Sequence, residues 1–456
     1  ALTMSAFEWR KSKRRGLLGQ IMVVLAIAVI AGYVFLAEQV KEKESETIGK
    51  LANEPLQTEN ELIPYFEERI RETEKSIEEA NQNGENGEFI YGHNIDYYND
   101  MIAEARERAA LAATAAAAYK EEKWAPVYDY QLFEDHRRLD MVAESKKGVH
   151  IPESLFGYEA AILQKEWMKE HNIKPVFPGS YISNIHEQWK PEDRKAKEWS
   201  RKLYRNMDHS GLFSLYMVFR DYLFFIPMCL LILLVGSGFS GERGKRPTLH
   251  LLETMPIKRR SLFLGKTIYS SVVAMGSAMV TFLFVVLVGT IFNRFGDWMY
   301  PVLRYHSNYE KQSFDFTGNR AFEGGYTFMP LGEYLLKALL LYVCVTLFLI
   351  ALANIIGLVA RQPLVVYALT GLISVAGYLA SWKLDDFAQF SPFLYLNVPK
   401  IVNGEILTLL NNPAISVTMA CAMLLGTTVI LLVVTYFWMS FEKKSLKKRK
   451  HSVAEV

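Results

Sequence analysis

The segment Gly265–Thr267 reads Gly-Lys-Thr, the residue types that end a phosphate-binding loop, in which backbone amides and the lysine hold the phosphates of a nucleotide. Such a loop also needs a glycine five residues earlier, and this position is Arg260. A second candidate, Gly244–Lys245, fails similarly, because Phe239 stands at the first glycine position and Arg246 at the hydroxyl position. We therefore expect neither ATP nor Mg²⁺ to bind to this chain.

The sequence also contains the first half of a zinc-protease motif but not the second. His186–Glu187 starts the pattern His-Glu-x-x-His, but Lys190 stands where the second histidine is required. The sequence therefore predicts no metal site and no catalytic residues.

Ion coupling would need carboxylates or histidines inside apolar spans, and the cores of the six apolar stretches described next contain none. Two charged pairs, Glu333 with Lys337 and Arg220 with Asp221, lie at span edges, where we interpret them as interfacial anchors. Asn354 lies within an apolar stretch, and we expect it to make an interhelical hydrogen bond.

Six stretches each contain about 20 consecutive uncharged residues, the length needed to cross a bilayer. The expected spans are 17–37, 211–241, 267–293, 334–360, 361–382 and 413–441. The first is too long for the apolar core of a signal peptide, and Glu38 follows it rather than a small-residue cleavage site, so we expect it to remain as an anchor.

Charge is distributed unevenly around these spans. Basic residues crowd into 1–16, 242–266 and 442–456, whereas residues 38–210 contain 24 Lys and Arg against 35 Asp and Glu, a net charge of −11. Because Lys and Arg are enriched on the cytoplasmic side of membranes, the basic segments and both termini are predicted to be cytoplasmic. We interpret the basic clusters as topology markers in a bacterial cell membrane and expect no nucleic-acid partner. The predicted extracellular segments are 38–210, 294–333 and 383–412.

Residues 38–210 are predicted to form a mainly helical domain. Apolar side chains recur at helical spacing from Leu62 to Ile77, and in alternating steps of three and four residues from Tyr98 to Tyr119. The segment Asn83–Gly87 between them is rich in turn-forming residues, which favours an antiparallel helical hairpin.

The loop 242–266 contains a short apolar run between Pro247 and Pro256, edged with basic residues. Its apolar residues are Leu249, Leu251, Leu252 and Met255. A helix there would lie along the membrane surface and present a small apolar surface to a cytosolic partner. An ordinary charged loop is the alternative.

This loop resembles that of the ABC-2 type permease family, in which an acidic residue, glycine, threonine and leucines precede a proline, an arginine and the lysine that opens the third span. The matching residues are Glu242, Gly244, Thr248, Leu251, Leu252, Pro256, Arg259 and Lys266. The chain departs from the family at Arg246 and Pro247, where a glycine usually adjoins the threonine. Phe7–Lys11 resembles the family's amphipathic elbow helix, expected here within residues 1–16.

The resemblance implies an all-α membrane protein with six transmembrane helices, which forms a dimer with an identical or related permease. It also implies a separate ABC ATPase subunit that binds ATP and Mg²⁺. The residues expected to contact this ATPase are Leu249, Leu252, Glu253, Met255, Pro256, Arg259, Glu8 and Trp9.

The large domain between the first two spans is similar to that of Gram-positive members, including peptide-toxin exporters. Because an acidic outer domain concentrates cations and uncharged spans suit apolar surfaces, export of amphipathic or antimicrobial peptides, for secretion or self-protection, is the expected function. A lipid or drug exporter of the same family is one alternative. A membrane receptor or sensor with an extracellular ligand-binding domain is another.

Overall fold

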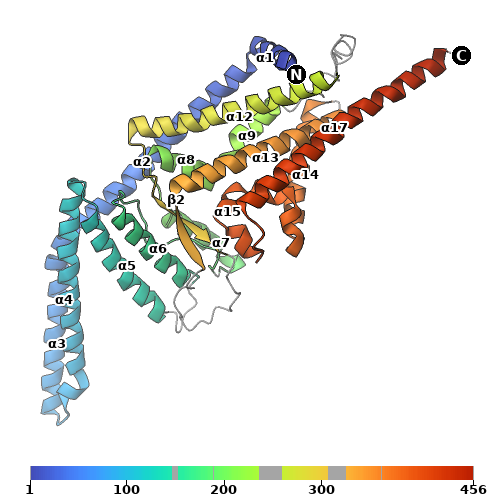
Figure 1. Cartoon of the computed structure of the whole chain (residues 1–456). Coiled ribbons are helices and arrows are strands. Elements are labelled where there is room, and N and C mark those ends of the chain that lie inside the picture. Colours follow the sequence, from blue (N-terminus) through green and yellow to red (C-terminus); the bar gives the residue numbers. More distant parts are fainter. Residues whose placement is uncertain are drawn as a thin grey trace.

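The computed structural model describes residues 2–145, 152–187, 189–235, 259–306, 325–360 and 362–454. The described part of the chain is mostly helical. Long helices lie side by side in one half of the molecule, and a helical hairpin projects from the opposite end (Figure 1).

Five helices in the described part of the chain are long and apolar enough to cross a membrane. They are α2 (Leu17–Gln57), α12 (Arg259–Phe292), α13 (Leu331–Val359), α14 (Pro363–Ser381) and α17 (Val417–Ala454). Helix α13 is the most buried and packs against α12, α14 and α17, whereas the others leave many large apolar side chains exposed, as lipid-facing helices do. Asn354 is buried on α13, but its Nδ2 has no hydrogen-bond partner among the described residues, so the expected interhelical bond is not observed there.

The segment 211–241, expected as one continuous span, is broken. Its described part forms α8 (Gly211–Arg220) and α9 (Phe225–Val235), and the apolar parts of these two helices are bent by 72° relative to each other. Pro227 favours the break, because its ring would clash with the carbonyl of residue 223 in a continuous helix and it has no N–H to donate there. Tyr222, at a φ of 61°, adopts the left-handed conformation that commonly ends a helix. Counting the bent pair as one span gives up to six spans.

Helix α8 crosses α12 at two glycines. A Cβ added to Gly289 would lie 2.7 Å from the Cα of Gly211, so only small residues allow this approach. The contact fixes the start of α8 against the end of α12.

The polar domain (residues 38–210) begins within α2, which continues beyond the membrane-spanning part of the helix. Helix α2 continues through the π-helical turn η1 (Thr58–Leu62) into α3 (Ile63–Gln82), and Pro55 accounts for the irregular turn because it interrupts the ladder of backbone hydrogen bonds. The expected antiparallel hairpin is confirmed, since α3 packs along α4 (Gly87–Lys120). Helices α5 (Ala125–Ser145), α6 (Leu155–Glu170), η2 (Pro191–Asp193) and α7 (Arg194–Leu203) complete the domain.

The described parts of segments 294–333 and 383–412 contain short elements. Strands β1 (Pro301–Tyr305) and β2 (Tyr326–Pro330) form an antiparallel pair, so the fold is not purely α-helical as expected. Both strands are rich in aromatic and β-branched residues, which suit a half-buried sheet. The second segment contains η3 (Asp385–Phe390), η4 (Pro392–Leu396), α15 (Val398–Val402) and α16 (Glu405–Leu409).

Candidate functional site

Helix α1 (Leu2–Arg15) packs against the beginning of α12. Gly16, at a φ of 66°, separates α1 from α2 and allows the chain to change direction. The Nζ of Lys266 on α12 lies 3.1 Å from the Oε1 of Glu8 on α1, and only 5% and 10% of these side chains are exposed. Met4 and Leu262 form a small apolar cluster between the two helices. The N-terminal helix is therefore fixed to the third span by a buried ion pair.

Two of the eight predicted ATPase-contact residues have side chains that the structure describes. Glu8 faces α12, whereas Trp9 is 51% exposed and accessible to a partner. The others lie outside the described residues, apart from the backbone of Arg259; they are Leu249, Leu252, Glu253, Met255 and Pro256. Contact with an ATPase stays a prediction for all eight.

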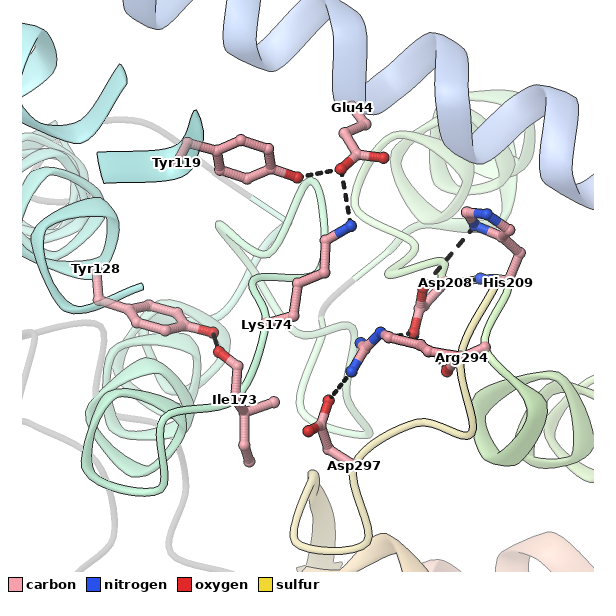
Figure 2. Close-up of polar contacts among 10 residues, drawn as sticks. Glu44, Tyr119, Tyr128, Ile173, Lys174, Asp208, His209, Arg294 and Asp297 are labelled. Carbon is pink, nitrogen blue, oxygen red and sulfur yellow. Dashed lines mark hydrogen bonds and ion pairs between the residues drawn. The ribbon is translucent and has the colours of Figure 1, made fainter. Parts of the chain in front are cut away.

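A group of polar side chains joins the polar domain to α2 (Figure 2). Glu44 on α2 accepts a hydrogen bond from the hydroxyl of Tyr119, at the end of α4, and its Oε1 lies 2.9 Å from the Nζ of Lys174. Burial acts to raise the pKa of Glu44, but the hydrogen bonds from Tyr119 and Lys174 lower it overall. Tyr128 donates to the carbonyl of Ile173 over 2.8 Å and so holds the Lys174 loop against α5.

A second group in Figure 2 ties the beginning of α8 to the segment after α12. Arg294 lies between two carboxylates, with its Nη2 3.1 Å from the Oδ2 of Asp208 and its Nη1 paired with Asp297. Burial acts to lower the pKa of Arg294, but the charges of Asp208 and Asp297 raise it overall. The N–H of Gly211 donates to the Arg294 carbonyl over 2.9 Å. The two groups together, which we name the ionic joint, connect the polar domain to the first three spans.

An apolar cavity of about 480 Å³ lies beside the break in the second span. Helices α9 and α14 form most of its wall, α13 contributes Leu349, and the residues at the end of η4 close one end. Cys229 and Gly371 line it from the two main helices, and no charged side chain belongs to its described lining. Since a Cβ added to Gly371 would meet no atom within 4 Å, the cavity is open at this position.

Hydrogen-bonding groups gather at the end of this cavity nearest the polar domain. The Tyr222 hydroxyl donates to the Oδ1 of Asn397 over 3.1 Å, and the Asn397 Nδ2 donates to the Tyr378 hydroxyl over 3.0 Å. Along the wall, the hydroxyls of Thr370 and Ser374 donate to carbonyls of their own helix, each over 2.7 Å. The cavity therefore suits a molecule with an apolar body and a more polar end, which is the usual composition of a small-molecule site.

Sequence reasoning did not find this cavity. Tyr222 and Asn397 are separated by 175 residues, and no local pattern links them. The available signal was Pro227 within an apolar run, preceded by the charged pair Arg220–Asp221, which together favour a broken helix over a continuous one.

Residues 197–305 match the family model described as ABC-2 family transporter protein. This range contains most of α7, both halves of the broken span, α12 and β1, and therefore includes one wall of the cavity. The match supports an ABC-2 type permease, a membrane subunit that transports and is generally not itself catalytic. Searches of curated proteins and of solved structures gave no match to the chain.

Proposed function

We propose that the chain is the membrane-spanning permease subunit of an ATP-driven ABC-2 type exporter and that the apolar cavity beside the broken second span receives its cargo. The cavity carries this proposal, because it is an apolar hollow of molecular size among the described spans. The family match covers α9, which forms one of its main walls. The sequence contains no phosphate-binding loop, which supports binding of ATP and Mg²⁺ by a separate ATPase subunit.

The proposed arrangement places both termini and the loop 242–266 in the cytoplasm of a Gram-positive bacterium. The polar domain then lies outside the cell, and a second permease completes a dimer. In this orientation, α1 lies on the ATPase side, where exposed Trp9 and the residues of the loop contact the partner. The buried pair of Glu8 and Lys266 links α1 to the third span and would transmit movement between them.

The cargo is an amphipathic molecule, because the cavity has apolar walls and hydrogen-bonding groups at one end. Two classes meet this description. The net charge of −11 on the polar domain favours amphipathic or antimicrobial peptides with positive charge, exported for secretion or self-protection. The cavity volume of about 480 Å³ favours a lipid or a lipid-like drug, since this space accommodates one apolar chain rather than a folded peptide.

The first test is whether ATP hydrolysis requires a second subunit. The purified full chain is expected neither to bind nor to hydrolyse ATP, and an ABC ATPase is expected to copurify with it from its native membrane. ATP binding by the chain alone, with one nucleotide per chain, would contradict the proposal.

A further inference from the structure

A second cavity, of about 360 Å³, lies at the junction of the polar domain, the end of α8 and β1. Unlike the apolar cavity, it is lined by four cationic side chains and one carboxylate. These are Arg201, Lys202, Arg205, Arg220 and Asp221. Tyrosine side chains contribute much of the remaining wall. An excess of positive charge next to hydroxyl donors is the composition of a site for phosphate or another anion.

Arg220 is positioned for such a role. Its Nη1 donates to the carbonyl of Asn206 over 2.8 Å, and its Nε lies 3.4 Å from the Oδ1 of Asp221. The guanidinium group also lies over the Tyr216 ring, 5.5 Å from the centroid. These contacts hold the side chain in place, yet its buried Nη2 has no hydrogen-bond partner among the described residues.

Asp221 cannot neutralise the cations around it. Arg205 pairs with the same carboxylate as Arg220, so two guanidinium groups share one negative charge. Lys43 adds a further cation nearby, because its Nζ donates to the Lys202 carbonyl over 3.4 Å. Burial, and next the charge of Arg220, lower the pKa of Arg205. An anion bound between the two arginines would relieve this repulsion.

Residues at the break in the second span line both the basic cavity and the apolar cavity. Asp221 lines the basic cavity, and the next residue, Tyr222, lines the apolar one. The Tyr222 hydroxyl marks the polar end of the apolar cavity through its bond to Asn397. The charged lining of one cavity and the apolar lining of the other are therefore contributed by consecutive residues at the break in the second span.

From this arrangement we infer that the basic cavity binds the phosphate or similar anionic head group of an amphiphile whose apolar chain lies in the cavity between α9 and α14. The inference rests on the proposed function, because it names the class of molecule that the transport cavity receives. It also selects between the two cargo classes. The polar domain as a whole is acidic, but the charge at the mouth of the cavity is positive and disfavours a cationic peptide.

The test uses the full chain in a neutral detergent and measures ligand affinity by native mass spectrometry. The probes are oleoyl lysophosphatidic acid, monoolein with the same chain and no phosphate, and inorganic phosphate. Wild-type protein is expected to bind the lysophosphatidic acid at least tenfold more tightly than monoolein. The double variant R205Q/R220Q is expected to lose this preference, because each charge-assisted hydrogen bond is removed.

Further variants separate binding from folding. D221N keeps both arginines and removes the competing carboxylate, so it is expected to strengthen phosphate binding severalfold, which a purely structural role would not produce. R201Q/K202Q alters exposed side chains on α7 and is expected to weaken phosphate binding without affecting the fold. R194Q removes a charge from the same helix at a side chain that is 85% exposed and outside the cavity, and it serves as the matched control.

The outcomes distinguish a lipid head group from a soluble anion. They also separate a failure of the anion site from a failure of the proposed transport cavity. Weaker lysophosphatidic acid binding in G371L, which fills the apolar cavity, supports a lipid head group. Lysophosphatidic acid binding that depends on Arg220 but not on Gly371, with inorganic phosphate bound equally tightly, supports a soluble anion and overturns the lipid assignment. Equal affinity for monoolein and lysophosphatidic acid in the wild-type protein overturns the anion site and leaves the apolar cavity standing. Binding of both lipids that is unaffected by G371L contradicts the proposed role of the apolar cavity.

Discussion

At the scale of single residues, side chains from distant parts of the sequence meet to form the charged and aromatic sites. His186 is an example, because its ring lies between aromatic residues, with centroids 4.8 Å from Phe156 and 6.2 Å from Tyr305. The sequence offered His186 only as the beginning of an incomplete zinc motif. Phe156 and Tyr305 come from α6 and β1, and such contacts depend on tertiary packing that no local pattern specifies.

His186 leads to a prediction about pH. Burial lowers its pKa from 6.5 to about 4, so the folded protein favours the neutral ring. The neutral ring therefore contributes up to about 3 kcal/mol to the free energy of unfolding. This contribution is complete above pH 6.5 and is lost as the pH falls from 6.5 towards 4. We expect thermal unfolding, followed by circular dichroism, to shift to lower temperature over this range in the wild type and less so in H186Q.

The control for this measurement is H93Q, because His93 is exposed on α4. It is expected to retain the pH dependence of the wild type. If H186Q and the wild type lose stability equally between pH 6.5 and 4, the assignment of this effect to His186 is wrong.

At the scale of elements, amphipathic patterns in the sequence predict helices well, whereas breaks within an apolar run are hard to predict. The hairpin of α3 and α4 could be predicted because its apolar stripes and the turn after Gln82 are local features. The break between α8 and α9 was missed because hydropathy averages over a window and does not register the effect of Pro227 on backbone hydrogen bonds. The strands β1 and β2 were missed because their pairing joins segments 20 residues apart within the predicted extracellular segment 294–333.

The contact of α1 with α12 allows a prediction about these two helices. Removing one member of a buried ion pair costs about 3–5 kcal/mol, since the other charge remains buried. We therefore expect E8Q to lower the unfolding temperature of the full chain and E8Q/K266Q to recover part of the loss. A double-mutant cycle is expected to give a coupling energy above about 1 kcal/mol.

The matched control is the pair of Glu46 and Lys50 on α2, which are 2.6 Å apart and 61% and 72% exposed, respectively. Solvent screens exposed pairs, so their cycle is expected to give well below about 1 kcal/mol. Coupling energies of equal size in the two cycles would show that the buried contact does not fix α1 to the third span.

At the scale of the whole molecule, the chain combines a bundle of spans with a polar domain, and the ionic joint connects them. Composition and charge predicted this division, because long uncharged runs and an acidic segment are visible in the sequence. They could not predict the cavity, whose walls come from α9, α13 and α14, or the basic surface within an otherwise acidic domain. Net charge describes a domain, whereas recognition depends on the few charges that face a cavity.

The most direct test of the account is the rate of ATP hydrolysis by the full chain reconstituted with its ATPase in proteoliposomes. The probes are cationic amphipathic peptides, oleoyl lysophosphatidic acid and monoolein, and the variants are G371L and G426L. Leucine at Gly371 enters the cavity, whereas leucine at Gly426, on α17, enters open space outside it. We expect at least one amphiphile to stimulate hydrolysis, G371L to reduce this stimulation at least tenfold, and G426L to behave like the wild type. Full stimulation of G371L, or no stimulation of the wild type by any amphiphile, would contradict the account.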